Sequence, residues 1–204
     1  MDLIRHHVAG QSTGSPERTG SVYDPATGAV QAEVAFASTA ETDAAIAAAA
    51  AALPAWRATS LIKRADVFFR LRHLLVERAD ELAAIITAEH GKVLSDAKGE
   101  ISRGIENVEF AAGLVHLLKG EHAEQVSRGV DVHSVKQPVG VVAAITPFNF
   151  PVMVPLWMTA SAIACGNTVV LKPSEKDPSA ALFLAKLYEE AGLPAGVLNV
   201  VHGD

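Results

Sequence analysis

The sequence has little cysteine, few aromatic residues and no basic clusters, and each shortage excludes a class of protein. One cysteine among 204 residues cannot form an intrachain disulfide or a cysteine-rich zinc site, which favours a reducing compartment and predicts a cytoplasmic protein. Aromatic residues make up 5% of the chain, and 17 Lys and Arg against 23 Asp and Glu give a net charge of −6. Because basic residues are few and dispersed, a nucleic-acid-binding surface is not expected.

The N-terminal residues lack the apolar core of a signal peptide and the Arg- and Ser-rich character of a transit peptide. An uncharged stretch from Gln137 to Leu171 is long enough to span a bilayer. Pro147, Pro151 and Gly166 cut it into strand-like and helix-like pieces, which favours the interior of an α/β sheet. The eight histidines are scattered without acidic or thiol partners at ligand spacing. Neither a membrane protein nor a metal site is therefore expected.

Half of the residues are hydrophobic, so the chain can bury a core. Residues 1–37 are rich in Gly, Pro, Ser and Thr, which predicts turns and edge strands. Helical spacing of apolar residues then predicts three helices, at about 38–53, 60–90 and 95–118. Ser38 and Glu41 have the spacing of a capping box, and Pro54 is expected to end the first helix.

The pattern changes at residue 126. Residues 126–137 alternate polar and β-branched side chains, which predicts a half-exposed strand or hairpin. Beyond them the pattern predicts a β-α-β-α-β series, whose elements are a buried strand at 139–145, a helix at 152–165, a strand at 168–171, a helix at 177–191 and a strand at 197–201. Asp177 is the expected N-cap of the second of these helices.

This series is half of a doubly wound parallel sheet, so the expected fold class is α/β. An N-terminal helical segment leads into the partial sheet, and an antiparallel strand arm lies between them in the sequence. We therefore divide the chain into 1–125, the N-terminal strands and helices of the sheet domain; 126–137, an oligomerisation-type arm; and 138–204, the β-α-β-α-β half.

Ligands of open α/β sheets bind beyond the carboxyl ends of the strands. In this sequence, polar residues follow two of the expected strands. Asn149 follows the first strand and precedes a helix, so its amide could stabilise a developing oxyanion or could simply cap the helix. Lys172 and Glu175 follow the second strand. They could hold a ribose from both sides, or they could form a solvated loop that pairs its own charges.

The segments TPFNFP (146–151), ACGNTVVLKPSE (164–175) and AGLPAGVLNVV (191–201) resemble the aldehyde dehydrogenase superfamily in its cofactor domain. The resemblance covers nearly the whole chain. Most members carry Trp where Phe148 stands. The Phe variant, with EHGK (89–92), DAKGE (96–100) and RGIE (103–106), is similar to the coenzyme A-acylating methylmalonate-semialdehyde dehydrogenases.

The resemblance implies roles for particular residues. Asn149 would stabilise the oxyanion in catalysis, and the backbone around Thr146 and Phe148 would lie against the nicotinamide end of NAD. Lys172 and Glu175 would hold the adenosine ribose, with Lys176 beside them as a further cofactor-binding residue. Arg103 would bind the substrate carboxylate, since a guanidinium forms two parallel hydrogen bonds with such a group; alternatively it pairs Glu100 or Glu106 on its own helix.

The implied reaction is NAD-dependent oxidation of methylmalonate or malonate semialdehyde through a cysteine thioester. Coenzyme A as co-substrate would yield propionyl- or acetyl-coenzyme A and CO₂, and the enzyme would be a homo-oligomer. The family's cysteine nucleophile is expected beyond residue 204, because Cys165 lies on an apolar helix and is interpreted as a buried small hydrophobe. Two alternatives stay open: a hydrolytic NAD(P)-dependent aldehyde dehydrogenase, and an inactive nucleotide-binding or assembly module.

Overall fold

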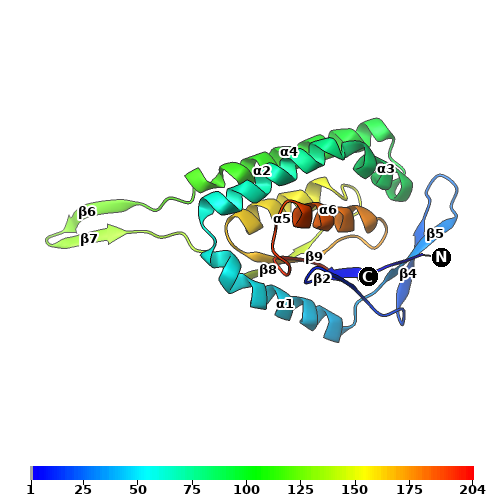
Figure 1. Cartoon of the computed structure of the whole chain (residues 1–204), viewed down its shortest axis with the longest axis horizontal. Helices are drawn as coiled ribbons and strands as arrows, with labels where there is room; N and C mark the ends of the chain where they lie inside the picture. The colour runs from blue at the N-terminus through cyan, green and yellow to red at the C-terminus, as the bar shows by residue number, and fades with distance from the viewer. Residues whose placement is uncertain (1) are drawn as a thin grey trace.

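The computed structural model describes residues 2–204, which form a central sheet with helices on both faces and a separate hairpin (Figure 1). The strands of the main sheet lie in the order β3-β2-β10-β9-β8. β8 (Val141–Ile145), β9 (Thr168–Lys172) and β10 (Leu198–Val200) are parallel neighbours. β2 (His6–Val8) and β3 (Gln11–Thr13) extend the sheet in the antiparallel sense. The expected α/β class, with a partial parallel sheet, is confirmed.

Helices pack on both faces of this sheet. α1 lies against one face, α5 and α6 lie against the other, and α2, α3 and α4 form an outer layer over α5 and α6 (Figure 1). The bounds are α1 Thr39–Ala58, α2 Leu61–Glu77, α3 Ala79–His90, α4 Leu94–Gly113, α5 Met153–Ala164 and α6 Ser179–Glu190, with a 3-10 turn at Leu114–His116. The loop from β8 to α5 and the loop from β9 to α6 begin at the carboxyl ends of these strands, and both loops carry the polar residues singled out from the sequence.

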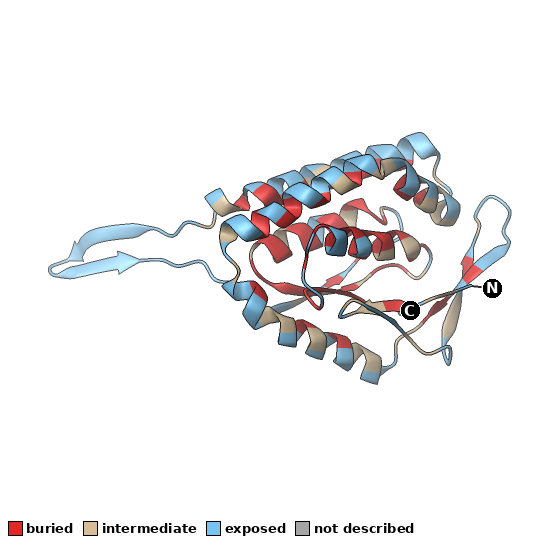
Figure 2. Ribbon diagram, in the orientation of Figure 1, coloured by how far each residue is buried: buried red, intermediate tan, exposed pale blue. Residues whose placement is uncertain are grey.

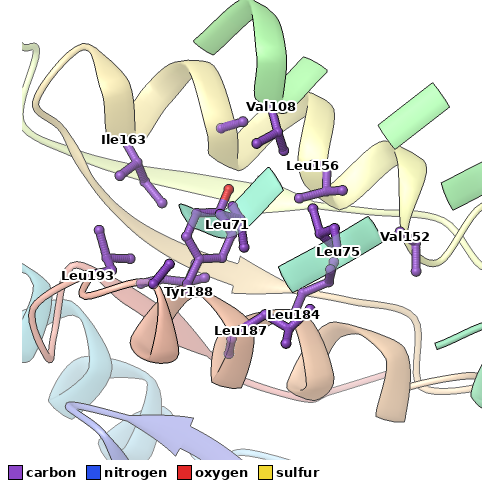
Figure 3. Close-up of a cluster of buried hydrophobic side chains, with 14 of the residues drawn as sticks. Leu71, Leu75, Val108, Val152, Leu156, Ile163, Leu184, Leu187, Tyr188 and Leu193 are labelled. Carbon is purple, nitrogen blue, oxygen red and sulfur yellow. The ribbon is translucent and has the colours of Figure 1, made fainter. Parts of the chain in front are cut away.

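The main apolar core lies between the sheet and the two helical layers. Buried residues gather in β9, β10, α5 and α6 and on the inward sides of α2 and α4 (Figure 2). Leu71 and Leu75 of α2 and Leu156 of α5 surround Tyr188 of α6 (Figure 3). The Tyr188 hydroxyl lies 3.1 Å from the hydroxyl of Thr159, so its polar end has a partner inside the core. The core therefore fixes the helices that begin at the candidate site.

Two smaller sheets lie outside the core. β1 (Asp2–Ile4) pairs with β5 (Val30–Ala35) in parallel, and β4 (Thr19–Tyr23) pairs with β5 in the antiparallel sense. β6 (His122–Ser127) and β7 (Val130–His133) form an antiparallel hairpin that projects from the body of the molecule (Figure 1). Every residue of both hairpin strands is exposed. The hairpin begins at His122, four residues before the expected start of the arm at residue 126.

Two helix boundaries differ from the sequence prediction. The expected end of the first helix at Pro54 is wrong, because α1 continues to Ala58 with Pro54 inside it. Trp56 is buried on the far side of the proline, and its indole N–H donates to the Ile163 carbonyl at 2.9 Å. The single helix expected at 60–90 is two helices, because the chain leaves helical geometry at Arg78.

The expected burial of β8 and the expected N-cap of α6 are also wrong. β8 was expected to be buried, yet Val141 is 37% and Ile145 is 71% exposed, because β8 is the last strand of its sheet. Asp177 does not cap α6: among residues 2–204, neither of its carboxylate oxygens has a hydrogen-bond partner. The first amide of α6, Ser179 N–H, instead donates to Glu89 Oε2 at 2.9 Å.

The long uncharged stretch divides into β8, α5 and β9. Within residues 2–204, no helix taken singly has the length and apolar character needed to cross a membrane. α1 and α2 meet that test only as a pair, which is bent by 114°.

Candidate functional site

The carboxyl ends of β8 and β9 lie side by side and bring the two polar groups of residues together. Ile145 and Lys172 are register partners in the parallel ladder. One residue further on, the Thr146 amide donates to the Lys172 carbonyl at 3.1 Å. The turn after β8, residues 146–151, and the loop after β9, residues 173–178, therefore form one continuous surface.

Lys172 and Glu175 form an ion pair on this surface. Lys172 Nζ donates to Glu175 Oε2 at 3.2 Å, and both side chains are about one-third exposed or less. Burial acts to raise the pKa of Glu175, but hydrogen bonds from its own backbone amide and from Lys172 together lower it below its ordinary value. Lys172 also lines a cavity of about 620 Å³ that runs along β8 to His202. Glu175 lines a different, neighbouring cavity, so the pair stands between the two and presents a donor to one and an acceptor to the other.

Lys176 and Phe148 bridge the loop and the turn. Lys176 Nζ lies 4.4 Å from the centroid of the Phe148 ring, a cation–π contact. His90 lies on the same ring, at 6.4 Å between centroids. A second cavity of about 480 Å³ lies between these residues and β4, and Glu175 and Asp177 also line it.

Asn149 lies at the exposed tip of the turn. Its backbone oxygen accepts a hydrogen bond from Lys92 Nζ at 3.0 Å, while its side-chain amide makes no hydrogen bond within residues 2–204. α5 begins at Met153 with Val152 as its N-cap residue, and the Asn149 side chain accepts no hydrogen bond from its first amides, so the capping alternative for Asn149 is wrong. The amide remains available to a ligand.

Arg103 faces the same turn from α4. Its guanidinium carbon lies 5.3 Å from the centroid of the Phe150 ring, and its Nε is 3.4 Å from the Gly99 carbonyl. Among the described ion pairs, Arg103 joins neither Glu100 nor Glu106, so the alternative that it pairs with its helical neighbours is also wrong. The structure thus places a cation against Phe150, the residue directly after Asn149 in the chain.

Lys92 and Glu100 were not singled out from the sequence, and they form the most buried ion pair of the site. Lys92 Nζ lies 2.6 Å from Glu100 Oε2, and the Glu100 side chain is fully buried. The signal was present, since Glu100 follows Ala97 by three residues and precedes Gly104 by four, on the apolar face of α4. A carboxylate on that face requires a buried partner.

Two further carboxyl groups lie beside the second cavity: Asp177, which is buried, and Glu89, which is half-buried. Burial raises the pKa of Asp177 from 3.8 to about 7, and the charges of Glu89 and Glu100 raise it further. Burial likewise raises the pKa of Glu89, against the hydrogen bonds it accepts from Ser179. No group of three His, Cys, Asp or Glu side chains within residues 2–204 could hold a metal ion.

Cys165 lies at the C-terminal end of α5, whereas Asn149 precedes its N-terminal end. It is half-buried, and burial raises the pKa of its thiol despite the nearby Arg64 guanidinium. A raised pKa disfavours the reactive thiolate. This placement agrees with a packing role for Cys165.

Half of a doubly wound parallel sheet, with polar side chains at two adjacent strand ends, is the architecture of a nucleotide-binding α/β domain. The chain belongs to the aldehyde dehydrogenase family, whose family model matches residues 12–204. The expected resemblance is thereby confirmed.

Individual relatives narrow the comparison. A malonate-semialdehyde dehydrogenase of Pseudomonas aeruginosa is 51% identical over 204 residues, which cover 100% of this chain and 41% of that protein. The crystal structure of a methylmalonate-semialdehyde dehydrogenase from Oceanimonas doudoroffii matches with a TM-score of 0.98 and 54% identity, over 100% of this chain and 42% of that one. A Sinorhizobium meliloti protein described as a methylmalonate-semialdehyde dehydrogenase, solved with NAD, matches with the same TM-score, 51% identity and the same coverage. The chain thus spans about two-fifths of the length of these relatives.

Proposed function

We propose that this chain is the cofactor-binding and oxyanion-stabilising part of an NAD-dependent, coenzyme A-acylating semialdehyde dehydrogenase. The whole enzyme would oxidise methylmalonate or malonate semialdehyde to propionyl- or acetyl-coenzyme A and release CO₂. The relatives named above support this substrate class. The observation that carries the proposal is the unpartnered Asn149 amide on the turn after β8, because the adjacent strand end, after β9, carries the Lys172–Glu175 pair.

The cofactor proposal depends on the surface after β8 and β9. Lys172 and Glu175 would hold the adenosine ribose, since Lys172 lines the large cavity as a donor and Glu175, paired with it, offers an acceptor next to it. Lys176 is held against Phe148, and the backbone of Thr146 and Phe148 would face the nicotinamide. When bound there, NAD would accept the hydride from the substrate.

Asn149 would act on the aldehyde oxygen. A cysteine thiolate that attacks the aldehyde carbon turns its oxygen into an oxyanion, and an amide N–H donor fixed beforehand stabilises that charge. Asn149 meets this requirement because its side-chain amide is free while its backbone oxygen is held by Lys92. The attacking thiolate would come from another part of the enzyme, since Cys165 lies at the opposite end of α5.

Arg103 would bind the carboxylate that distinguishes a semialdehyde from a simple aldehyde. Its guanidinium is exposed and forms no ion pair with Glu100 or Glu106 of its own helix, and it lies near the ring of Phe150, directly after Asn149 in the chain. A planar guanidinium forms paired hydrogen bonds with a carboxylate.

The hairpin supports a homo-oligomeric enzyme. Four valines are exposed on it and on the segment that follows, namely Val126, Val130, Val132 and Val135. A projecting hairpin with exposed apolar residues gains burial when a second copy packs against it. Size-exclusion chromatography with Val130→Lys, which is expected to shift the full-length protein toward smaller species, tests this part of the proposal.

The catalytic proposal is tested by NADH formation in the full-length enzyme, with methylmalonate semialdehyde and with or without coenzyme A. We expect coenzyme A-dependent turnover, with propionyl-coenzyme A and CO₂ as products. Asn149→Ala should lower kcat by about 10²–10³, the usual loss for one oxyanion donor, whereas Cys165→Ser should leave it nearly unchanged. Equal rates without coenzyme A, with a free acid as product, would instead identify a hydrolytic enzyme.

A further inference from the structure

The Asn149 turn is held by a single buried cation. Lys92 Nζ donates to the Asn149 backbone oxygen at 3.0 Å and to Glu100 Oε2 at 2.6 Å. It also lies 4.7 Å from the centroid of the Phe150 ring. The Lys92 side chain is only 11% exposed, although the turn that it holds is at the surface.

Glu100 holds the other end of the same segment. Its second oxygen, Oε1, accepts hydrogen bonds from the backbone amides of Val152 at 2.8 Å and Met153 at 3.1 Å. These amides open α5, so Glu100 caps that helix from α4, 52 residues before Val152 in the chain. A carboxylate at a helix N-terminus also interacts favourably with the helix dipole. Lys92 and Glu100 together fix residues 149–153 at both ends.

Stability alone does not account for this pair. Taking a lysine and a glutamate out of water costs as much as their attraction returns in many proteins, and apolar replacements are often neutral or stabilising. A satisfied buried polar network instead restricts the backbone to one arrangement. Here all the groups it restrains lie within or next to the turn that presents Asn149.

We propose that the Lys92–Glu100 pair is a positioning device, which sets the direction of the Asn149 side-chain amide by holding the backbone on both sides of it. The inference rests on the proposed oxyanion role of Asn149. Neither Lys92 nor Glu100 touches the reacting atoms. Their effect on the reaction runs through the backbone of the turn, where a displacement of about 1 Å is enough to lower a rate by about 10².

The test uses Lys92→Met in the full-length enzyme, which removes the charge and keeps the length of the side chain. We expect kcat to fall by about 10- to 100-fold while KM for NAD changes less than about threefold, because the residues proposed to hold the ribose, Lys172 and Glu175, are paired with each other at the end of β9 and not with Lys92. The matched control is Lys98→Met, since Lys98 pairs with Asp80 at 2.7 Å on the exposed side of α4. Its kcat should stay within about twofold of the parent value.

A double variant separates positioning from a merely structural effect. If Lys92 acts through Asn149, then Lys92→Met should lower kcat little or not at all in the Asn149→Ala background, because coupled residues are not additive. Additive losses, or an unchanged kcat in Lys92→Met, would overturn the inference. If Asn149→Ala itself leaves kcat unchanged, the proposed function fails instead, and the two failures are therefore distinguishable.

Glu100→Gln provides a second variant in case Lys92→Met does not fold. Its amide oxygen can still accept from Val152 and Met153, but it cannot form the ion pair with Lys92. The same kcat loss with an unchanged KM for NAD is expected. A fall in melting temperature without any fall in the kcat of the folded enzyme would show that the pair is structural only.

Discussion

The Arg103 guanidinium makes a cation–π contact with Phe150, at 5.3 Å from the ring centroid, and none of the described ion pairs joins it to a carboxylate of its own helix. Glu100, three residues before Arg103, is already paired with Lys92. The cation is therefore exposed, fixed by a ring, and available to an anion that approaches Asn149.

Arg103→Leu in the full-length enzyme should lower kcat/KM for methylmalonate semialdehyde by about 10², equivalent to about 2–3 kcal/mol of lost transition-state binding. Activity on propanal, which has no carboxylate, should change much less. Arg72→Leu is the matched control, because Arg72 is about half exposed on α2 and pairs with Glu109. A parallel loss for both aldehydes would show that Arg103 does not recognise the carboxylate.

Lys172→Ala and Glu175→Ala should each weaken NAD binding by about 10- to 100-fold, since a hydrogen bond to a charged group contributes about 1.5–3 kcal/mol. Fluorescence titration of the full-length enzyme with NAD measures the change. Glu81→Ala removes another carboxylate paired at three-residue spacing, with Arg78 on α3, and should leave the affinity unaltered. An unchanged affinity for NAD in both Lys172→Ala and Glu175→Ala would mean that the pair stabilises its own loop and does not bind the cofactor.

Two glycines of α4 should respond oppositely to the same substitution. A Cβ at Gly104 would lie 2.8 Å from Leu156 Cδ1, in the contact between α4 and α5, whereas a Cβ at Gly99 would meet nothing within 4 Å. Gly104→Ala should therefore destabilise the fold by about 1–3 kcal/mol through overpacking. Gly99→Ala should stabilise it by about 0.5–1 kcal/mol, because alanine favours the helix. Urea unfolding of the two variants gives the comparison, and equal effects would contradict this account of the helix contact.

Asp177 should make the fold less stable as pH rises. Burial raises its pKa from 3.8 to about 7, so the folded state binds its proton more tightly than the unfolded state does. The contribution of Asp177 is therefore fully present below about pH 4 and is lost as pH rises to about 7. Asp177→Asn should raise stability at pH 8 by about 2–4 kcal/mol and change it little at pH 4. Thermal unfolding at both pH values, with exposed Asp66→Asn as control, measures this; a variant with the parent's pH dependence would contradict it.

The sequence predicts elements whose signals are local and misses those set by distant contacts. The capping box of Ser38 and Glu41 forms as expected, because its partners are three residues apart. Pro54 was expected to end α1, but the burial of Trp56 against α5 keeps the helix going, and that contact joins residues 107 positions apart. The break at Arg78 is hidden because Leu75 and Leu82 keep helical spacing across it while both point into the same core.

The candidate site divides in the same way. Two strand ends, recognisable from their apolar runs and the polar residues after them, were enough to predict that the turn with Asn149 and the loop after Lys172 leave the sheet at the same edge. The Lys92–Glu100 pair was missed because its function lies in a backbone contact with residues 149–153. Asp177 looked like an N-cap from its position before Pro178, but Glu89 of α3 occupies that role. Tertiary partners of polar groups leave little trace in a single sequence.

β8 ends the five-stranded sheet with one of its edges unpaired within residues 2–204, and its side chains Val141 and Ile145 are exposed. Such an edge is a template for any strand that can reach it. A strand that pairs there binds the folded state and not the unfolded one, so it stabilises the fold by mass action. A melting temperature measured on this chain is therefore a property of its concentration, and of whatever shares its solution, as well as of its sequence.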